Sequence, residues 1–133
     1  MNKKIVFSTV LFSIIVLILS YIVIGSSTKK QQEKNNSLLP AKNEIVFYYG
    51  NTCPHCAEVE RWMRENKVEE KLKIIKKEVY QNQANAQELD YVAQNCGLNP
   101  QMIGVPFLYA DGKCYIGTDE VEKVIEDKIK IKN

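Results

Sequence analysis

The alternation of apolar and polar positions divides the chain into three parts. Residues 5–25 contain no charged side chain and are rich in Ile, Val, Leu and Phe. Residues 26–43 are polar, and from residue 44 short apolar runs alternate with turn residues and helical periodicities. This pattern predicts an N-terminal membrane anchor (1–25), a flexible polar linker (26–43) and one folded domain (44–133).

The pattern within residues 44–133 predicts seven elements. In chain order they are a strand at 45–49, a helix that follows the Cys motif, a strand at 71–80, a helix with the apolar face Ala86, Leu89, Val92, Ala93 and Cys96, strands at 105–109 and 113–116 around Asp111-Gly112, and a last helix capped by Thr118. The order β-α-β-α-β-β-α predicts an α/β fold. Its first two strands would be parallel with a right-handed crossover, and the closing hairpin antiparallel, giving a mixed four-stranded sheet flanked by helices.

The apolar stretch 5–25 is long enough to span a bilayer core of about 30 Å as a helix. A cleaved signal peptide is the alternative, although its apolar region is usually about 7–15 residues long and ends at a small-x-small site. Lys3 and Lys4 favour an N-terminus inside the cell. We therefore expect a single-pass anchor in the cell membrane, with the domain on the extracytoplasmic side.

Charge separates the anchor region from the domain. The formal net charge is +2, from 18 basic and 16 acidic residues, but Lys3, Lys4, Lys29 and Lys30 flank the apolar stretch. Without these four, 14 basic residues face 16 acidic ones, a net charge of −2. A mildly acidic domain has no electrostatic basis for binding nucleic acid.

The motif Cys53-Pro54-His55-Cys56 follows the first strand and begins the first helix of the domain. With Cys53 at the N-cap, Pro54 takes the first helical position, where its missing N–H costs nothing. The exposed N–H groups and the helix dipole should lower the pKa of the Cys53 thiol and make it the attacking sulfur. Cys56, one turn further and less exposed, would resolve the mixed disulfide. A protonated His55 would stabilise the thiolate and make the pair more oxidising.

Two other interpretations of the motif are open. Cys53 and Cys56 could form half of a zinc site completed by His55, Cys96 or Cys114, but zinc sites usually bring a second close pair of ligands. A purely structural disulfide is also possible. A Cys-x-x-Cys motif that opens a helix after a buried strand favours redox chemistry over both.

The run Tyr49 to Cys56, together with Gly104-Val105-Pro106, resembles the thioredoxin-like superfamily over roughly two-thirds of the chain. Pro54-His55 is similar to the dipeptide of its bacterial disulfide-oxidant (DsbA-like) branch. The resemblance implies that Pro106 is cis and faces the active disulfide, and that Val105 offers its backbone to the substrate peptide. An ordinary trans loop proline is the alternative. A cis bond would be costly enough to suggest selection.

The chain also departs from this superfamily. Thioredoxin has a buried Asp six positions before its first cysteine, where this chain has Phe47, so efficient thioredoxin-style reduction is not expected. The core is minimal, without the large helical insertion of the disulfide-oxidant enzymes. The segment Gly117-Thr118-Asp119-Glu120 looks somewhat like the glutaredoxin segment that holds glutathione, although the same residues make a routine helix cap.

Cys96 and Cys114 make the number of cysteines even. In an oxidising compartment they could form a second disulfide, structural or acting as an electron relay. Alternatively, Cys96 continues an apolar helix face and could be a buried free thiol. We favour the disulfide, which requires a Cα–Cα distance of about 4.4–6.8 Å.

These observations predict a monomeric thiol–disulfide oxidoreductase that needs no cofactor besides its Cys53–Cys56 pair. Its partners would be cysteine-containing exported proteins or a redox partner in the same membrane, and the motif favours oxidation of substrates. The alternatives are an extracytoplasmic reductase or glutaredoxin-like protein, and a non-catalytic metal-binding module or metallochaperone using Cys53, His55 and Cys56.

Overall fold

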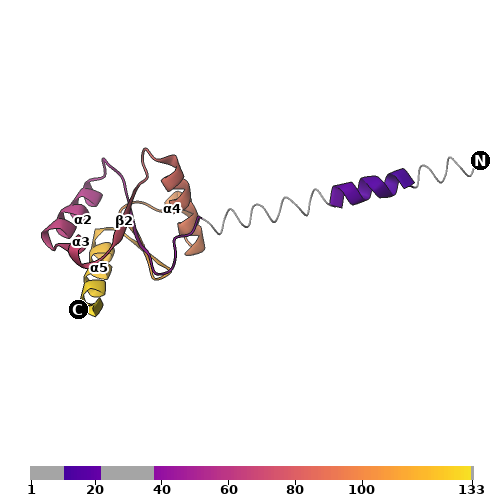
Figure 1. Cartoon of the computed structure of the whole chain (residues 1–133). Helices are drawn as coiled ribbons and strands as arrows, with labels where there is room; N and C mark the ends of the chain where they lie inside the picture. The colour runs from indigo at the N-terminus through magenta and orange to yellow at the C-terminus, as the bar shows by residue number, and fades with distance from the viewer. Residues whose placement is uncertain (1–10, 22–37, 133) are drawn as a thin grey trace, which may run out of the picture. The chain divides into compact units, whose positions relative to one another are not determined.

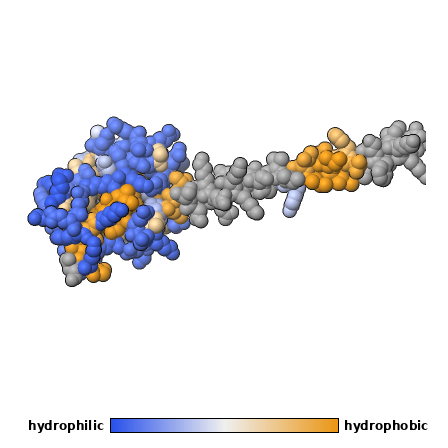
Figure 2. Space-filling model, viewed as in Figure 1, coloured by the Kyte–Doolittle hydropathy of each residue, from blue (hydrophilic) through white to orange (hydrophobic). Residues whose placement is uncertain are grey.

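The computed structural model describes residues 11–21 and 38–132 of the chain. Contacts divide it into two compact units, residues 1–37 and 38–133. In the first unit residues 11–21 are helical, and large apolar side chains on this helix are exposed (Figure 2). Among the described residues no helix has both the length and the apolar character needed to cross a bilayer. The rest of the expected anchor, 1–10 and 22–25, lies outside the described residues, and the anchor stays a prediction.

The second unit contains four strands, four α-helices and one 3₁₀ helix within residues 38–132. In chain order these are β1 (Ile45–Tyr49), α2 (Pro54–Glu65), α3 (Val68–Lys71), β2 (Ile74–Glu78), α4 (Gln83–Asn95), η1 (Pro100–Met102), β3 (Phe107–Ala110), β4 (Lys113–Ile116) and α5 (Thr118–Lys132). Apart from α3 and η1, this is the predicted order β-α-β-α-β-β-α.

The four strands form one mixed sheet in the order β2-β1-β3-β4. Strands β1 and β2 are parallel, whereas β3 is antiparallel to both β1 and β4. Asp111 and Gly112 connect β3 to β4, and both have positive φ, 53° and 75°. Such a turn matches the twist of a hairpin, which explains why this Asp-Gly pair marks the reversal. The predicted mixed sheet is confirmed.

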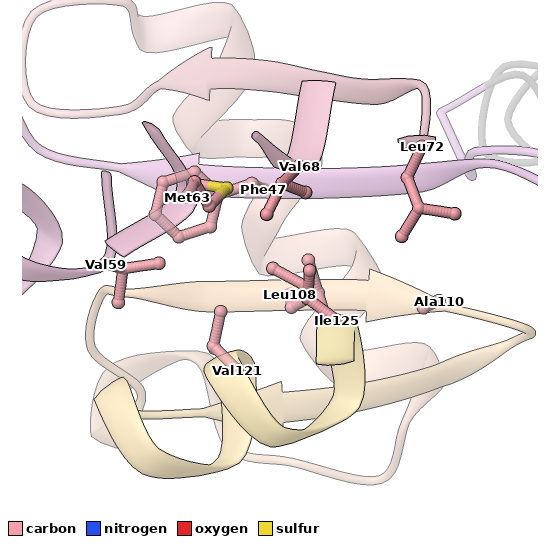
Figure 3. Packing of buried hydrophobic residues seen from close by; sticks show 9 residues of the cluster. All are labelled: Phe47, Val59, Met63, Val68, Leu72, Leu108, Ala110, Val121 and Ile125. Carbon is pink, nitrogen blue, oxygen red and sulfur yellow. The ribbon is translucent and has the colours of Figure 1, made fainter. Parts of the chain in front are cut away.

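Helices cover both faces of the sheet (Figure 1). Helices α2, α3 and α5 pack on one face, around a cluster made by Phe47, Val59, Met63, Val68, Leu72, Leu108, Ala110, Val121 and Ile125 (Figure 3). Helix α4 covers the other face with Leu89, Val92 and Ala93, which pack against Val46, Tyr48, Phe107 and Tyr109. The central strands β1 and β3 therefore supply side chains to two cores, and all four residues of β3 are buried.

Three local features differ from the sequence-based expectations. The compact unit begins at Leu38, six residues before the expected start of the domain at residue 44, and Leu39 packs against the α4-side cluster. The one-turn helix α3 precedes β2, because Lys67 takes a left-handed conformation that reverses the chain after α2. Thr118, expected to cap the last helix, is instead the first residue of α5. The N–H of Val121 donates to the carbonyl of Gly117, the residue before the helix.

Candidate active site

Cys53 is the N-cap residue of α2. It has extended backbone angles, φ −84° and ψ 114°, and Pro54 follows at the first helical position. The backbone N–H of Cys56 donates to the Cys53 sulfur at 3.1 Å. The sulfur therefore occupies the place of a capping oxygen, where the free N–H groups and the dipole of α2 stabilise negative charge on it.

Cys53 and Cys56 form a disulfide with a Cα–Cα distance of 5.3 Å. Of the two residues Cys53 is more accessible, being 7% exposed against 1% for Cys56. An incoming sulfur can therefore approach Cys53 more easily than Cys56. This arrangement allows attack at Cys53, with Cys56 as the leaving and resolving sulfur.

The loop before β3 lies against this disulfide. The Val105–Pro106 peptide bond is cis, and the Cys53 sulfur lies 3.6 Å from the carbonyl oxygen of Val105. The carbonyl of Pro106 accepts a hydrogen bond from the N–H of Gly117 at 2.9 Å, which links the loop to the start of α5. The structure thus brings Val105 and Pro106 to the Cys pair, from more than 50 residues along the chain.

A cavity of about 570 Å³ lies beside the Cys pair. It is lined by His55, Glu58, Gly104, Val105, Pro106, Ile116, Gly117, Thr118, Asp119 and Glu120. Two helix starts, those of α2 and α5, contribute its polar side chains, and the cis-proline loop forms its apolar wall. A cavity of this size can accept a peptide segment or a small thiol next to Cys53.

His55 is the only basic side chain among the residues that line this cavity. Its side chain is 73% exposed, and its Nδ1 lies 3.9 Å from Oε2 of Glu58. His55 therefore lies on the solvent side of the motif, with the Glu58 carboxylate next to its imidazole.

Cys96 and Cys114 form a second disulfide with a Cα–Cα distance of 6.2 Å. Cys96 is the C-cap of α4 and Cys114 lies in β4, so the bond ties the helix on one face of the sheet to an edge strand. The 18-residue separation encloses the whole cis-proline loop. The second pair thus holds the ends of the segment that positions Val105.

A partly buried polar network lies on the α4 side of the sheet. The hydroxyl of Tyr48, a fully buried residue, donates to Oε1 of Glu88 at 2.6 Å, and Lys77 Nζ donates to the same oxygen at 2.6 Å. Burial, followed by the hydrogen bond to Glu88 and its negative charge, raises the pKa of Tyr48 far above its ordinary value. Tyr48 therefore stays protonated and serves as a structural donor rather than a proton acceptor for the cysteines.

Glu78 organises the loop after β2, next to the turn that leads into Cys53. Its carboxylate accepts hydrogen bonds from the backbone N–H groups of Tyr80, Gln81 and Asn82, at 2.7–3.0 Å. Desolvation would raise the pKa of Glu78, but these donors and the backbone of Asn51 outweigh it, so the pKa is lowered. The ring of Tyr80 lies over Gly50, where an added Cβ would meet it at 2.3 Å.

A second, smaller cavity of about 260 Å³ lies on the other side of the cis-proline loop. It shares Gly104 and Val105 with the first cavity, and Val79, Tyr80, Ala86, Leu89, Asp90, Pro100 and Ile103 complete it.

Within residues 11–21 and 38–132, no group of three or more His, Cys, Asp or Glu side chains is arranged to hold a metal ion.

The search of solved structures finds glutaredoxins. Glutaredoxin C1 of Populus tremula x tremuloides is 17% identical, with a TM-score of 0.49 over 74% of this chain and 89% of that one. A buckwheat glutaredoxin–glutathione complex is 20% identical (TM-score 0.47; 77% and 82%), and oxidised glutaredoxin 2 of Chlamydomonas reinhardtii is 17% identical (0.45; 74% and 83%). No protein-family model and no curated protein matches the chain.

The sheet order, the cis-proline loop and the Cys pair at the start of α2 define a thioredoxin-like fold with a Cys-x-x-Cys disulfide. The resemblance inferred from the sequence is therefore confirmed.

Sequence reasoning missed Glu58 as a residue of the site. Its position three residues after His55 places it on the same face of α2, so the helical periodicity could have indicated it. It also missed the network of Tyr48 and Glu88, whose partners are 40 positions apart and carry no local signal.

Proposed function

We propose that this chain is a thiol–disulfide oxidoreductase that oxidises cysteine pairs in proteins through Cys53 and Cys56. The observation that carries the proposal is the Cys53 sulfur at the N-cap of α2. It accepts the N–H of Cys56 at 3.1 Å and lies 3.6 Å from the carbonyl oxygen of Val105, a residue that lines the cavity of the cis-proline loop. A sulfur held in this way is a good leaving group and a stabilised thiolate.

The proposed reaction starts from the oxidised pair. A substrate thiolate attacks the Cys53 sulfur, a mixed disulfide forms, and the Cys53–Cys56 bond breaks with Cys56 leaving as a thiolate. The second substrate thiolate then attacks the substrate sulfur of the mixed disulfide, and Cys53 leaves. The substrate loses two electrons and forms a disulfide, and the two protein thiols carry the electrons until an electron-accepting redox partner reoxidises them.

Trapping tests the proposal. A reduced Cys56→Ser variant has no resolving sulfur, so it should accumulate mixed disulfides with oxidised protein substrates, whereas Cys53→Ser should accumulate none. Mass spectrometry of the adducts names the substrates. If both variants trap equally, or neither traps, the proposal is wrong.

The reverse direction, reduction of disulfides, uses the same residues. The reduction potential of the pair separates the two directions: a value near −120 mV fits an oxidant and a value near −270 mV fits a reductant. The capped sulfur, and His55 when it is protonated, would favour the reduced form of the pair and with it the oxidising direction.

We further propose that residues 5–25 tether the domain to the cell membrane on its extracytoplasmic side. The support is the absence of charge over these residues and the basic residues Lys3 and Lys4 before them. The substrates would then be exported proteins near the membrane. Labelling of intact cells with a membrane-impermeant maleimide, after mild reduction, should reach Cys53 if the domain faces outward, and should fail if it faces the cytoplasm.

A further inference from the structure

The polar wall of the cavity beside Cys53 is acidic. Glu58 from α2, together with Asp119 and Glu120 from the first turn of α5, lines it, and no Lys or Arg side chain does. The carboxylates come from two helices, α2 and α5, so they do not lie on a single helix face.

A neighbouring residue indicates that these carboxylates act on the same space. Burial, followed by the charges of Glu58 and Asp119, raises the pKa of Glu122, while Arg61 partly offsets them. Arg61 is exposed and is not part of the cavity lining. Carboxylates of α2 and α5 are thus close enough to act on the same group, Glu122.

The start of α5 is an unfavourable place for an incoming carboxylate. Helix N-termini usually attract anions through free N–H groups. Here the N–H of Ile116 donates to Oε2 of Glu120 at 3.1 Å, and the N–H of Gly117 donates to the carbonyl of Pro106 at 2.9 Å. These two donors belong to the end of β4 and to the residue before α5, and within the first turn of α5 the side chains of Asp119 and Glu120 place negative charge at the positive end of the helix dipole.

We propose that this cavity selects polypeptide segments that carry Lys or Arg beside the reacting cysteine, and that it disfavours anionic thiols such as glutathione. The selection rests on the proposed function, since it concerns the substrate of the same Cys53. Coulomb attraction between a substrate cation and one of these carboxylates corresponds to about a fivefold change in binding at 4 Å in water. Salt should weaken the selection, because the Debye length falls to about 3 Å at 1 M.

A set of matched dithiol peptides tests the selection. Three peptides differ only in the residues next to the first cysteine, which are Arg, Gln or Glu. Oxidised full-length protein is mixed with each at pH 8, above the ordinary titration range of histidine. The rate of peptide oxidation is followed by quenching with N-ethylmaleimide and mass spectrometry. The expected order is Arg, then Gln, then Glu, with about fivefold between neighbours at low salt and a smaller spread at 1 M.

Protein variants separate this effect from the intrinsic reactivity of the peptides. Glu58→Gln and Asp119→Asn should each reduce the ratio of the Arg to the Glu peptide rate by about fivefold or less. Glu65→Gln is the matched control, because Glu65 lies two turns further along α2, is exposed, and is not part of the cavity lining. It should leave the ratio as in the wild type.

The outcomes distinguish the two proposals. If the three peptides react equally, or if Glu65→Gln lowers the ratio as much as Glu58→Gln does, the charge selection is wrong while the exchange activity stands. If no peptide is oxidised faster than by Cys53→Ser protein, the proposed function itself fails. Glutathione and its diester, which lacks the two carboxylates and keeps the amino group, give a second readout: the diester should react faster with the oxidised pair, and faster reaction of glutathione would overturn the selection.

Discussion

The sulfur of Cys53 lies 3.6 Å from the carbonyl oxygen of Val105, although the two residues are 52 positions apart. This contact joins the start of α2 to the cis-proline loop before β3. The backbone of Val105 is therefore next to any sulfur that reacts with Cys53. The loop thus lies where it can hold an extended substrate segment during exchange.

In the reduced protein, Cys53 should react with iodoacetamide near neutral pH much faster than Cys56. The N-cap position and the N–H of Cys56 stabilise a thiolate at Cys53, whereas Cys56 is almost fully buried inside the helix. Alkylation of the reduced protein as a function of pH, followed by peptide mass spectrometry, measures both rates.

The Asp111→Ala variant provides a comparison for this alkylation experiment, since Asp111 lies in the β3–β4 turn. It should leave the alkylation profile of Cys53 as in the wild type. Equal rates at Cys53 and Cys56 in wild-type protein would contradict the assignment of Cys53 as the attacking sulfur.

Loss of the second disulfide should destabilise the domain. The bond closes a loop of 18 residues, for which chain entropy predicts about 3 kcal/mol. The Cys96→Ala/Cys114→Ala variant should therefore unfold at a lower urea concentration than the wild type. Urea unfolding without reductant measures the change.

The Cys53→Ser/Cys56→Ser variant is the comparison for this loss. The disulfide that it lacks spans only three positions, so the same entropy estimate gives roughly half the loss of stability. A larger loss for this pair than for Cys96 and Cys114 would show that the second disulfide does not stabilise the domain through loop closure.

Replacing Glu88 in the network under α4 should lower the stability of the domain more than replacing Tyr48. Tyr48→Phe removes one hydrogen bond to a charged group, about 1.5–3 kcal/mol, and leaves Glu88 paired with Lys77. Glu88→Ala should cost more, because it leaves the buried Tyr48 hydroxyl and the Lys77 ammonium without their partner. Urea unfolding at pH 7 ranks the stabilities of these variants. The double variant Tyr48→Phe/Glu88→Ala should be no less stable than Glu88→Ala.

The same network should lower the stability of the protein at high pH. Burial and the contact with Glu88 raise the pKa of Tyr48, so the unfolded chain loses this proton first. The contribution of Tyr48 to stability is complete below the ordinary tyrosine value of about 10 and is lost as the pH rises above it. Tyr48→Phe should remove that part of the alkaline loss, as measured by unfolding at pH 9, 10 and 11. An unchanged alkaline slope would contradict the assignment.

Much of the fold follows from local signals in the sequence. Pro54 after Cys53 marks the start of α2, and Asp111-Gly112 marks the hairpin, because each residue pair restricts its own backbone. The one-turn helix α3 was missed because Lys67, and not the neighbouring Asn66, takes the left-handed conformation, which is uncommon for lysine. Contacts between distant residues have no such signal: Glu58 and Asp119 line the same cavity, and the packing of α2 against α5 brings them there.

Acid should weaken the loop that Glu78 organises. Its backbone donors keep the pKa of Glu78 below the ordinary value despite desolvation, so the folded state favours the carboxylate more than the unfolded chain does. This contribution is complete above the unfolded value of about 4.3 and is lost as the pH falls through the lower, folded value. Glu78→Gln should therefore flatten the decline of stability between about pH 5 and pH 3, as measured by urea unfolding across that range. The substitution should also increase proteolysis after Tyr80 at pH 7, because glutamine offers one neutral acceptor oxygen to the N–H groups of Tyr80, Gln81 and Asn82, which now share two carboxylate oxygens. The exposed Glu65→Gln variant serves as the control in both experiments. If the acid decline of Glu78→Gln matches the wild type, the three hydrogen bonds do not bias Glu78 towards its charged form.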